Sequence, residues 1–103
     1  MKAHQLQERL ESLILTLSDV NFEVQFRMGL QALVDYKKAG GSQQDIWDKL
    51  YPLHMKWVYV EEKHLNEFEQ KSDLIGDWLD CICGNVGNRY YSIWGAYKNL
   101  GSE

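Results

Sequence analysis

The two cysteines, Cys81 and Cys83, are the strongest candidates for metal or redox chemistry in this sequence. A structural zinc site takes four ligands, but the chain has no second cysteine pair, and its three histidines are scattered at positions 4, 54 and 64. On a helix, side chains two positions apart point about 200° away from each other, so these thiols could neither share a metal nor form a disulfide. The pattern predicts buried, unreactive thiols and no metal or cofactor site.

Acid–base catalysis would need a histidine or carboxylate placed beside a nucleophile or a substrate site. His54 and His64 have no serine, cysteine or carboxylate at a recognisable motif spacing. The adjacent carboxylates of Glu61 and Glu62 diverge by about 100° on a helix, which does not suit a catalytic pair. The sequence therefore favours a protein that is not an enzyme, and a small enzyme using His54 or His64 is kept as the third hypothesis.

Negative charge is concentrated in residues 61–80, which contain seven acidic residues and two lysines, a net charge of −5 in a chain of net charge −4. On a continuous helix, five of these acids fall within about 80° of arc, away from the apolar face. They are Glu62, Glu69, Asp73, Asp77 and Asp80. Like charges four residues apart destabilise a helix by about a few tenths of a kcal/mol, so this acidic stripe is not a stability device.

Two interpretations of the acidic stripe are open: a solvated face, or an electrostatic docking face for a basic protein. Direct binding of nucleic acid is not expected, because phosphate contacts need clustered Lys and Arg. Aromatic residues make up 13% of the chain. They dominate the energetics of many interfaces but also fill the cores of small domains, where we expect most of them. The aromatic residues of 47–59 and 90–97 are the alternative docking region.

The elements that carry these residues are predicted to be helical, because apolar residues recur three and four positions apart along most of the chain. The predicted helices cover 4–17, 20–38, a segment from Ser42 that ends or bends near Tyr51 before Pro52, then 53–60, 61–83 and 89–98. Residues 53–60 contain β-forming side chains, and they are interpreted as helical because no second strand exists to pair with them.

Residue types at the expected helix ends support this division. Gly40-Gly41 ends the second helix, and Ser42 with Asp45 resembles a capping box that opens the third. Ser72 is expected to be an N-cap if the helical pattern of 61–83 is broken. The closing helix over 89–98 is short, so it must dock, and we expect Ile93 and Trp94 to be buried against the helix over 74–82.

Length and composition bound the fold and the compartment. The chain has 103 residues, 45% of them apolar, which predicts one all-α domain over 1–103, a single compact bundle of five or six short helices. No run of about 18 apolar residues is present, so a membrane span is not expected. The first residues lack the apolar stretch of a secretory signal, so we expect a cytoplasmic protein.

A resemblance lies in the second half of the chain. The residues that carry it are Asp77-Trp78-Leu79-Asp80-Cys81-Ile82-Cys83-Gly84 and then Tyr90-Tyr91-Ser92-Ile93-Trp94. This pattern resembles small helical immunity proteins of bacterial contact-dependent growth inhibition and related polymorphic toxin systems. The resemblance implies a non-enzymatic protein that binds one cognate toxin domain in the cytoplasm and blocks its active site. Such toxins are often basic nucleases, for which an acidic inhibitor is electrostatically suited.

The leading hypothesis is therefore an immunity protein that forms a 1:1 heterodimer with a cognate toxin domain through the acidic stripe. The alternative is an all-α adaptor or regulatory subunit that assembles through a hydrophobic groove. Neither hypothesis includes a cofactor, a metal, direct nucleic-acid binding or a membrane.

Overall fold

The computed structural model describes residues 1–63, 70–87 and 91–100, and these residues form helices and irregular segments without a strand. The helices are α1 (Ala3–Leu15), α2 (Phe22–Lys38), α3 (Gln43–Glu62) and α4 (Lys71–Cys83). The molecule is compact, with a radius of gyration of 13.1 Å. The all-α prediction is confirmed, but the described residues contain four helices, whereas five or six were predicted.

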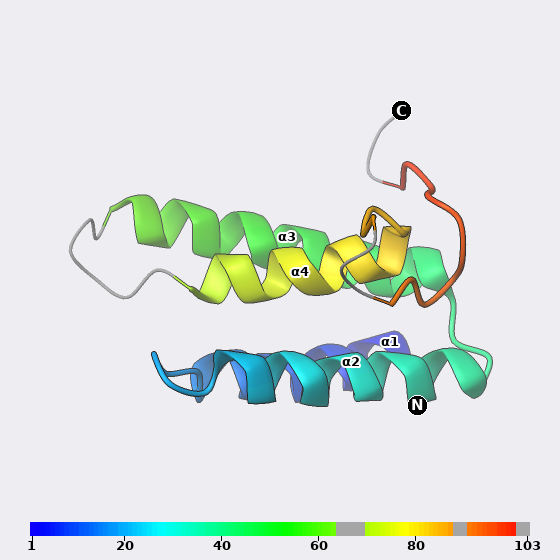
Figure 1. The fold of residues 1–103 in the computed structure, drawn as a ribbon, viewed down its shortest axis with the longest axis horizontal. Helices are drawn as coiled ribbons and strands as arrows, with labels where there is room; N and C mark the ends of the chain where they lie inside the picture. Colours follow the sequence, from blue (N-terminus) through cyan, green and yellow to red (C-terminus); the bar gives the residue numbers. More distant parts are fainter. Residues whose placement is uncertain (64–69, 88–90, 101–103) are drawn as a thin grey trace.

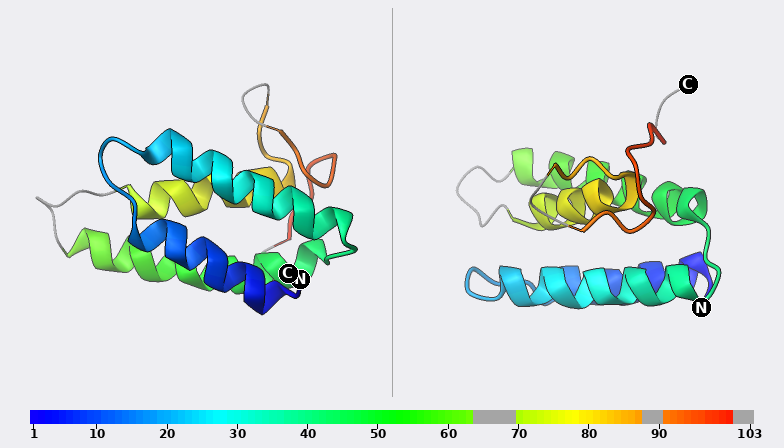
Figure 2. Two further views of the ribbon diagram at one scale, coloured as in Figure 1. Left: turned by 90° about the horizontal axis from the view of Figure 1, so that it is seen from below. Right: turned by 45° about the vertical axis from the view of Figure 1, so that its right-hand side comes forward.

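The four helices form two stacked hairpins. α1 and α2 make one layer, and α3 and α4 make the other (Figure 1). Helix α1 packs against α2 and α3, while α4 packs against α3 and α2. The view from below shows the same arrangement, with α2 lying over α4 and α1 lying over α3 (Figure 2). No helix of the described residues is both long and apolar enough to cross a membrane.

The first two helices follow the predicted periodicity closely. In α1, Leu6, Leu10 and Ile14 are buried on one face, as their spacing indicates. Helix α2 ends where Gly40 adopts a left-handed φ of 90°. The N–H of Gly41 then donates to the carbonyl of Tyr36 at 2.9 Å. This pattern satisfies a carbonyl that the last helical turn leaves without a partner.

Helix α3 begins as predicted, and residues 53–60 are helical as predicted, but they continue the same helix. The Oγ of Ser42 accepts a hydrogen bond from the N–H of Asp45 at 3.1 Å, which is the expected N-cap contact. Pro52 does not end the helix, which continues to Glu62 and includes residues 53–60. Pro52 and Asp48 are both exposed. Water can therefore solvate the Asp48 carbonyl, for which Pro52 supplies no N–H, and this lowers the cost of an internal proline.

The break within 61–83 lies earlier than predicted, and Ser72 is not the N-cap of α4. Helix α4 starts at Lys71, with Gln70 as N-cap. The carboxylate of the buried Glu61, from the end of α3, accepts hydrogen bonds from the N–H of Lys71 at 3.0 Å and the N–H of Ser72 at 3.3 Å. It also accepts from the Ser72 hydroxyl at 2.6 Å. Glu61 thus satisfies donors that the first turn of α4 leaves free, and this contact joins the two helices.

The predicted closing helix is wrong over its described part, because residues 91–98 are not helical. Gly95 adopts a left-handed φ of 95°, which a right-handed helix does not contain. The N–H groups of Ile93 and Lys98 donate to carbonyls of α4 and are therefore not part of a local helix. Ile93 is buried as expected, whereas Trp94 is half-buried. Residues 88–90 of this prediction lie outside the described part of the chain.

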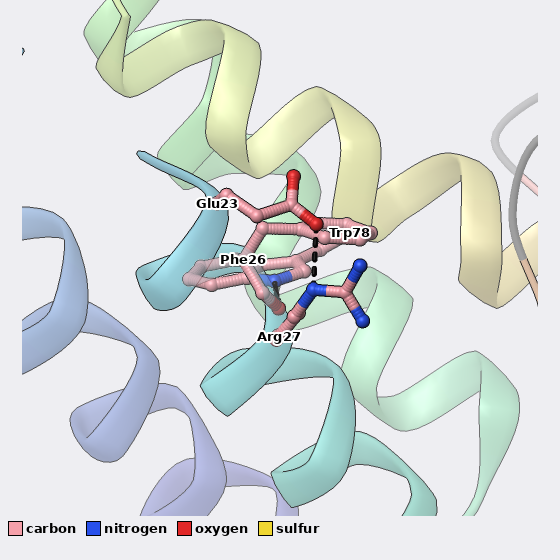
Figure 3. A network of polar contacts seen from close by, with 4 residues as sticks. All are labelled: Glu23, Phe26, Arg27 and Trp78. Carbon is pink, nitrogen blue, oxygen red and sulfur yellow. Dashed lines mark hydrogen bonds and ion pairs between the residues drawn. The ribbon is translucent and has the colours of Figure 1, made fainter. Parts of the chain in front are cut away.

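The contact between α2 and α4 is centred on Trp78. This side chain is fully buried, and its indole Nε1–H donates to the carbonyl of Phe26 at 3.0 Å (Figure 3). A Cβ atom at Gly29 would lie 2.2 Å from the indole ring, so glycine is the residue that lets this large side chain approach α2. Glu23 and Arg27, which flank Phe26 in the sequence of α2, form an exposed ion pair at 2.6 Å (Figure 3). This exposed pair contributes little to stability.

Candidate protein-binding surfaces

The acidic stripe is divided between two helices. Asp73, Asp77 and Asp80 lie on α4, whereas Glu62 is the last residue of α3. Glu69 lies outside the described residues. The stripe was derived for a continuous helix, but the chain leaves α3 at Glu62 and enters α4 at Lys71, and the two helices pack side by side. Among the described residues of the stripe, the structure therefore places Asp73, Asp77 and Asp80 on one helix and Glu62 on a neighbouring helix.

The three aspartates of α4 share one face opposite its core. They follow one another at intervals of four and three residues, which keeps them on adjacent turns. Asp73 is exposed, whereas Asp77 and Asp80 are half-buried. Both half-buried aspartates also interact with other residues of the chain. We call Asp73, Asp77 and Asp80 the acidic face of α4.

The electrostatic effect of this face reaches the cysteines. Cys81 and Cys83 are buried and not bridged, as the sequence predicts. Burial, and to a lesser extent the nearby charges of Asp77 and Asp80, raise the pKa of the Cys81 thiol to about 12. Burial is also the main cause of the raised pKa of Cys83. Both thiols therefore stay protonated and unreactive near neutral pH.

A second candidate surface lies on the outer side of α3, where three large side chains are exposed. Tyr51, Met55 and Tyr59 have exposed fractions of 42%, 46% and 62%. The ring of Tyr51 stacks on that of Trp47 with a centroid distance of 5.6 Å. The ammonium group of Lys63 lies over Tyr59, 5.0 Å from the ring centroid. We call Tyr51, Met55 and Tyr59 the aromatic face of α3.

Part of this surface was within reach of sequence reasoning, which named residues 47–59 as the alternative docking region. Most aromatic residues were expected in the core, however, and the exposure of Tyr51 and Tyr59 was not anticipated. The sequence feature that could have predicted this exposure is the distribution of apolar residues around α3. A helix packed on one side cannot bury apolar residues that lie on all its sides.

A small cavity lies between α1 and α3. It has a volume of about 100 Å³ and is lined by Glu11, Ile14, Leu15, Lys56 and Trp57. Pockets for drug-sized ligands usually measure about 300–1,000 Å³, so this cavity does not suit a substrate of that size. The ammonium groups of Lys56 and Lys71 lie 5.8 Å and 5.4 Å from the Trp57 ring centroid, which accounts for both lysines as cation–π contacts.

The histidine hypothesis gains no catalytic partner from the described residues. His54 lies on α3 facing α4, and a Cβ atom at Gly76 would be 3.4 Å from its Nε2 atom. Its Nδ1 atom is buried and has no hydrogen-bond partner within the described part of the chain. His64 lies outside that part. Over the same residues, no group of three His, Cys, Asp or Glu side chains is placed to hold a metal ion.

Comparisons of the chain with models of protein families, with curated proteins and with solved structures found no match.

Proposed function

We propose that this chain is an immunity protein, which binds and neutralises a cognate, basic, nuclease-type toxin domain by covering its active site. The proposal includes a 1:1 complex in the cytoplasm and no catalytic role for the chain. The acidic face of α4 is the observation that carries it. A partner that presents Lys and Arg to bind nucleic acid would be attracted to such a face, which would speed association and orient the two proteins.

The helix dipole acts in opposite directions on the two ends of this face. Asp73 lies in the first turn of α4, where the helix dipole favours a negative charge. Asp80 lies in the last turn before the C-cap at Gly84, where the dipole disfavours one, and that turn contains no basic residue. Glu62 and Glu69 belong to the proposed interface as flanking charges. The resemblance of residues 77–94 to immunity proteins supports the same function.

The aromatic face of α3 favours a second candidate, an adaptor or regulatory subunit that assembles through apolar contacts. Tyr51, Met55 and Tyr59 are exposed on one helix, and aromatic and Met side chains are enriched at the centres of interfaces. The two candidates differ in salt dependence, because apolar docking is insensitive to moderate salt while docking through exposed charges is screened.

Co-expression tests the proposal directly. A candidate toxin domain, taken from the product of the reading frame next to the gene for this chain, is produced in bacterial cells with and without the chain. Growth and complex formation are then measured. The proposal expects the chain to restore growth and to co-purify with the toxin domain in equal amounts. A toxin domain that kills equally in both cultures and forms no complex would reject it.

A matched pair of variants distinguishes a specific docking face from an effect of the net charge of the chain. Asp73→Asn, Asp77→Asn and Asp80→Asn together should reduce protection. The control combines Glu8→Gln, Asp19→Asn and Asp35→Asn, which removes the same charge from exposed positions of the other hairpin. The control should protect like the parent. Equal protection by both variants would leave the aromatic face of α3 as the preferred surface.

A further inference from the structure

Two aromatic rings near the C-terminal end of α3 already carry lysines of the chain itself. The ammonium group of Lys63 lies 5.0 Å from the ring centroid of Tyr59. Those of Lys56 and Lys71 lie 5.8 Å and 5.4 Å from the ring centroid of Trp57. The faces of aromatic rings are electron-rich and attract a cation placed within about 6 Å of the centroid. Both rings are therefore supplied with cations from within the molecule.

Trp47 and Tyr51, nearer the start of α3, form an aromatic pair without such a cation. Their rings stack with a centroid distance of 5.6 Å and an interplanar angle of 16°. Within the part of the chain that the structure describes, no Lys or Arg side chain lies over either ring. Tyr51 is 42% exposed, and Trp47 is half-buried. A partner can therefore reach this pair and supply the cation.

A carboxylate lies on the same part of α3. Asp48 is exposed, follows Trp47 directly and precedes Tyr51 by three residues, which places it one helical turn from Tyr51. Its Oδ1 atom accepts a hydrogen bond from the side-chain amide of Gln44 at 2.8 Å. Because a carboxylate has about four acceptor sites, Asp48 can still accept from a further donor.

The register between α3 and α4 adds acidic charge beside the aromatic pair. Glu61 binds the first turn of α4, and His54 lies beside Gly76, where a Cβ atom would be 3.4 Å from the imidazole Nε2. The two helices therefore run antiparallel, as Figure 1 also shows. Tyr51 precedes His54 by three residues, so it lies level with the turn of α4 that follows Gly76 and contains Asp80. The aromatic pair thus adjoins the acidic face of α4.

We infer that the Trp47–Tyr51 pair is the docking site for an arginine side chain of the partner protein, an inference that rests on the proposed function and adds the residue that anchors the complex. A planar guanidinium can stack on an aromatic ring and donate hydrogen bonds to a carboxylate at the same time, whereas a lysine ammonium is a compact charge without a planar face. Asp48 supplies that carboxylate. The acidic face of α4 guides the basic partner toward the chain, and the aromatic pair holds it.

Isothermal titration calorimetry of the chain with a candidate toxin domain, taken from the product of the neighbouring reading frame, tests the inference at moderate salt, where long-range charge effects are screened. Tyr51→Leu keeps an apolar side chain but removes the ring, and it should weaken binding at least about tenfold. Tyr51→Phe keeps the ring and should bind within about threefold of the parent. Tyr59→Leu is the matched control and should bind like the parent, because the ring of this exposed tyrosine already carries Lys63. Both tyrosines lie outside the core cluster, so the variants should keep the circular dichroism of the parent.

Replacing each arginine of the toxin domain by lysine in turn identifies the partner residue. One such variant should bind the parent chain at least about tenfold more weakly, while it binds Tyr51→Leu as well as the unchanged toxin domain does. If Tyr51→Leu binds like the parent, if Tyr51→Phe or Tyr59→Leu loses as much, or if no arginine shows this coupling, the inference is wrong while the proposed function stands. If the parent neither binds a candidate toxin domain nor protects cells from it, the proposed function fails, and the inference fails with it.

Discussion

Two tryptophans mark the contrast between the four-helix bundle and residues 91–100, which we call the strap. Trp78 is fully buried on a regular helix, with its indole N–H satisfied by Phe26 and its ring against Gly29. Trp94 is half-buried on an irregular segment and meets Tyr36 only at an edge. The same residue type thus anchors the core in one region and covers it in the other. The difference teaches that residue type alone does not determine burial, and neither does regular backbone, because Ile93 of the irregular segment is buried while Tyr59 of the regular helix α3 is exposed.

The largest expected effect separates these two tryptophans. Trp78→Ala should lower the free energy of unfolding by about 3–5 kcal/mol, because it leaves a large cavity between α2 and α4. Trp94→Ala should cost less, about 1–2 kcal/mol, because a half-buried edge contact is lost. Urea denaturation followed by circular dichroism measures both, with Tyr97→Ala as an exposed control. If both alanine variants lose the same free energy of unfolding, Trp94 contributes as much to the core as Trp78, and the contrast is wrong.

A second comparison concerns two neighbouring glutamates at the end of α3. Glu61→Ala should destabilise the chain by about 2 kcal/mol, because the N–H groups of Lys71 and Ser72 lose a charged acceptor. Glu61→Gln should cost less, since one amide oxygen can still accept. The exposed Glu62 is the matched control, and Glu62→Ala should change stability by less than about 0.5 kcal/mol. Equal effects of the two alanine variants in urea denaturation would contradict the capping role of Glu61.

Periodicity made part of this fold predictable. The buried stripe of α1, the glycine stop of α2 and the Ser42 cap of α3 are local features, and each was confirmed. Pro52 does not end α3, which was one of the two outcomes predicted for it, because the effect of a proline depends on exposure of the preceding turn, which a local pattern does not reveal. Residues 89–98 were predicted as a helix because Tyr90, Ile93, Trp94 and Tyr97 recur at helical spacing, whereas the N–H groups of Ile93 and Lys98 donate to carbonyls of α4.

The candidate site was predictable to the extent that it lies on one helix. Asp73, Asp77 and Asp80 share a face of α4, as their spacing indicates. Glu62 lies on a different helix, because α3 ends at Glu62 and α4 begins at Lys71. The contact of Glu61 with Lys71 and Ser72 that joins the two helices is long-range, so no local pattern discloses it. The pairing of Trp78 with Gly29 likewise joins distant residues, and one sequence does not disclose which positions meet.

Alkaline pH should lower the free energy of unfolding through the buried thiol of Cys81. The pKa of Cys81 is raised from 9.0 to about 12, with burial as the main cause. A raised pKa means that the folded state favours the neutral thiol, so its stabilising contribution is complete below pH 9 and is lost as pH rises toward 12. Tyr36, whose pKa is also raised by burial, acts in the same direction.

The measurement is the urea midpoint at neutral pH and at about pH 10.5, between the two pKa values of the Cys81 thiol. The parent should lose more stability than the Cys81→Ala variant over this interval. A parent and a variant with the same pH dependence would contradict the raised pKa of Cys81.

The most direct measurement of the proposed function is the association rate of the chain with its proposed partner, a candidate toxin domain taken from the product of a neighbouring reading frame, followed by stopped-flow at low and moderate salt. With the acidic face of α4 at the rim of the interface, the Asp73→Asn, Asp77→Asn and Asp80→Asn combination should associate at least about tenfold more slowly at low salt. It should also lose much of the salt dependence of the parent. The Glu8→Gln, Asp19→Asn and Asp35→Asn control should keep both. If the α4 combination and the parent share the same rate and salt dependence, the acidic face of α4 is a solvated surface and the account is wrong.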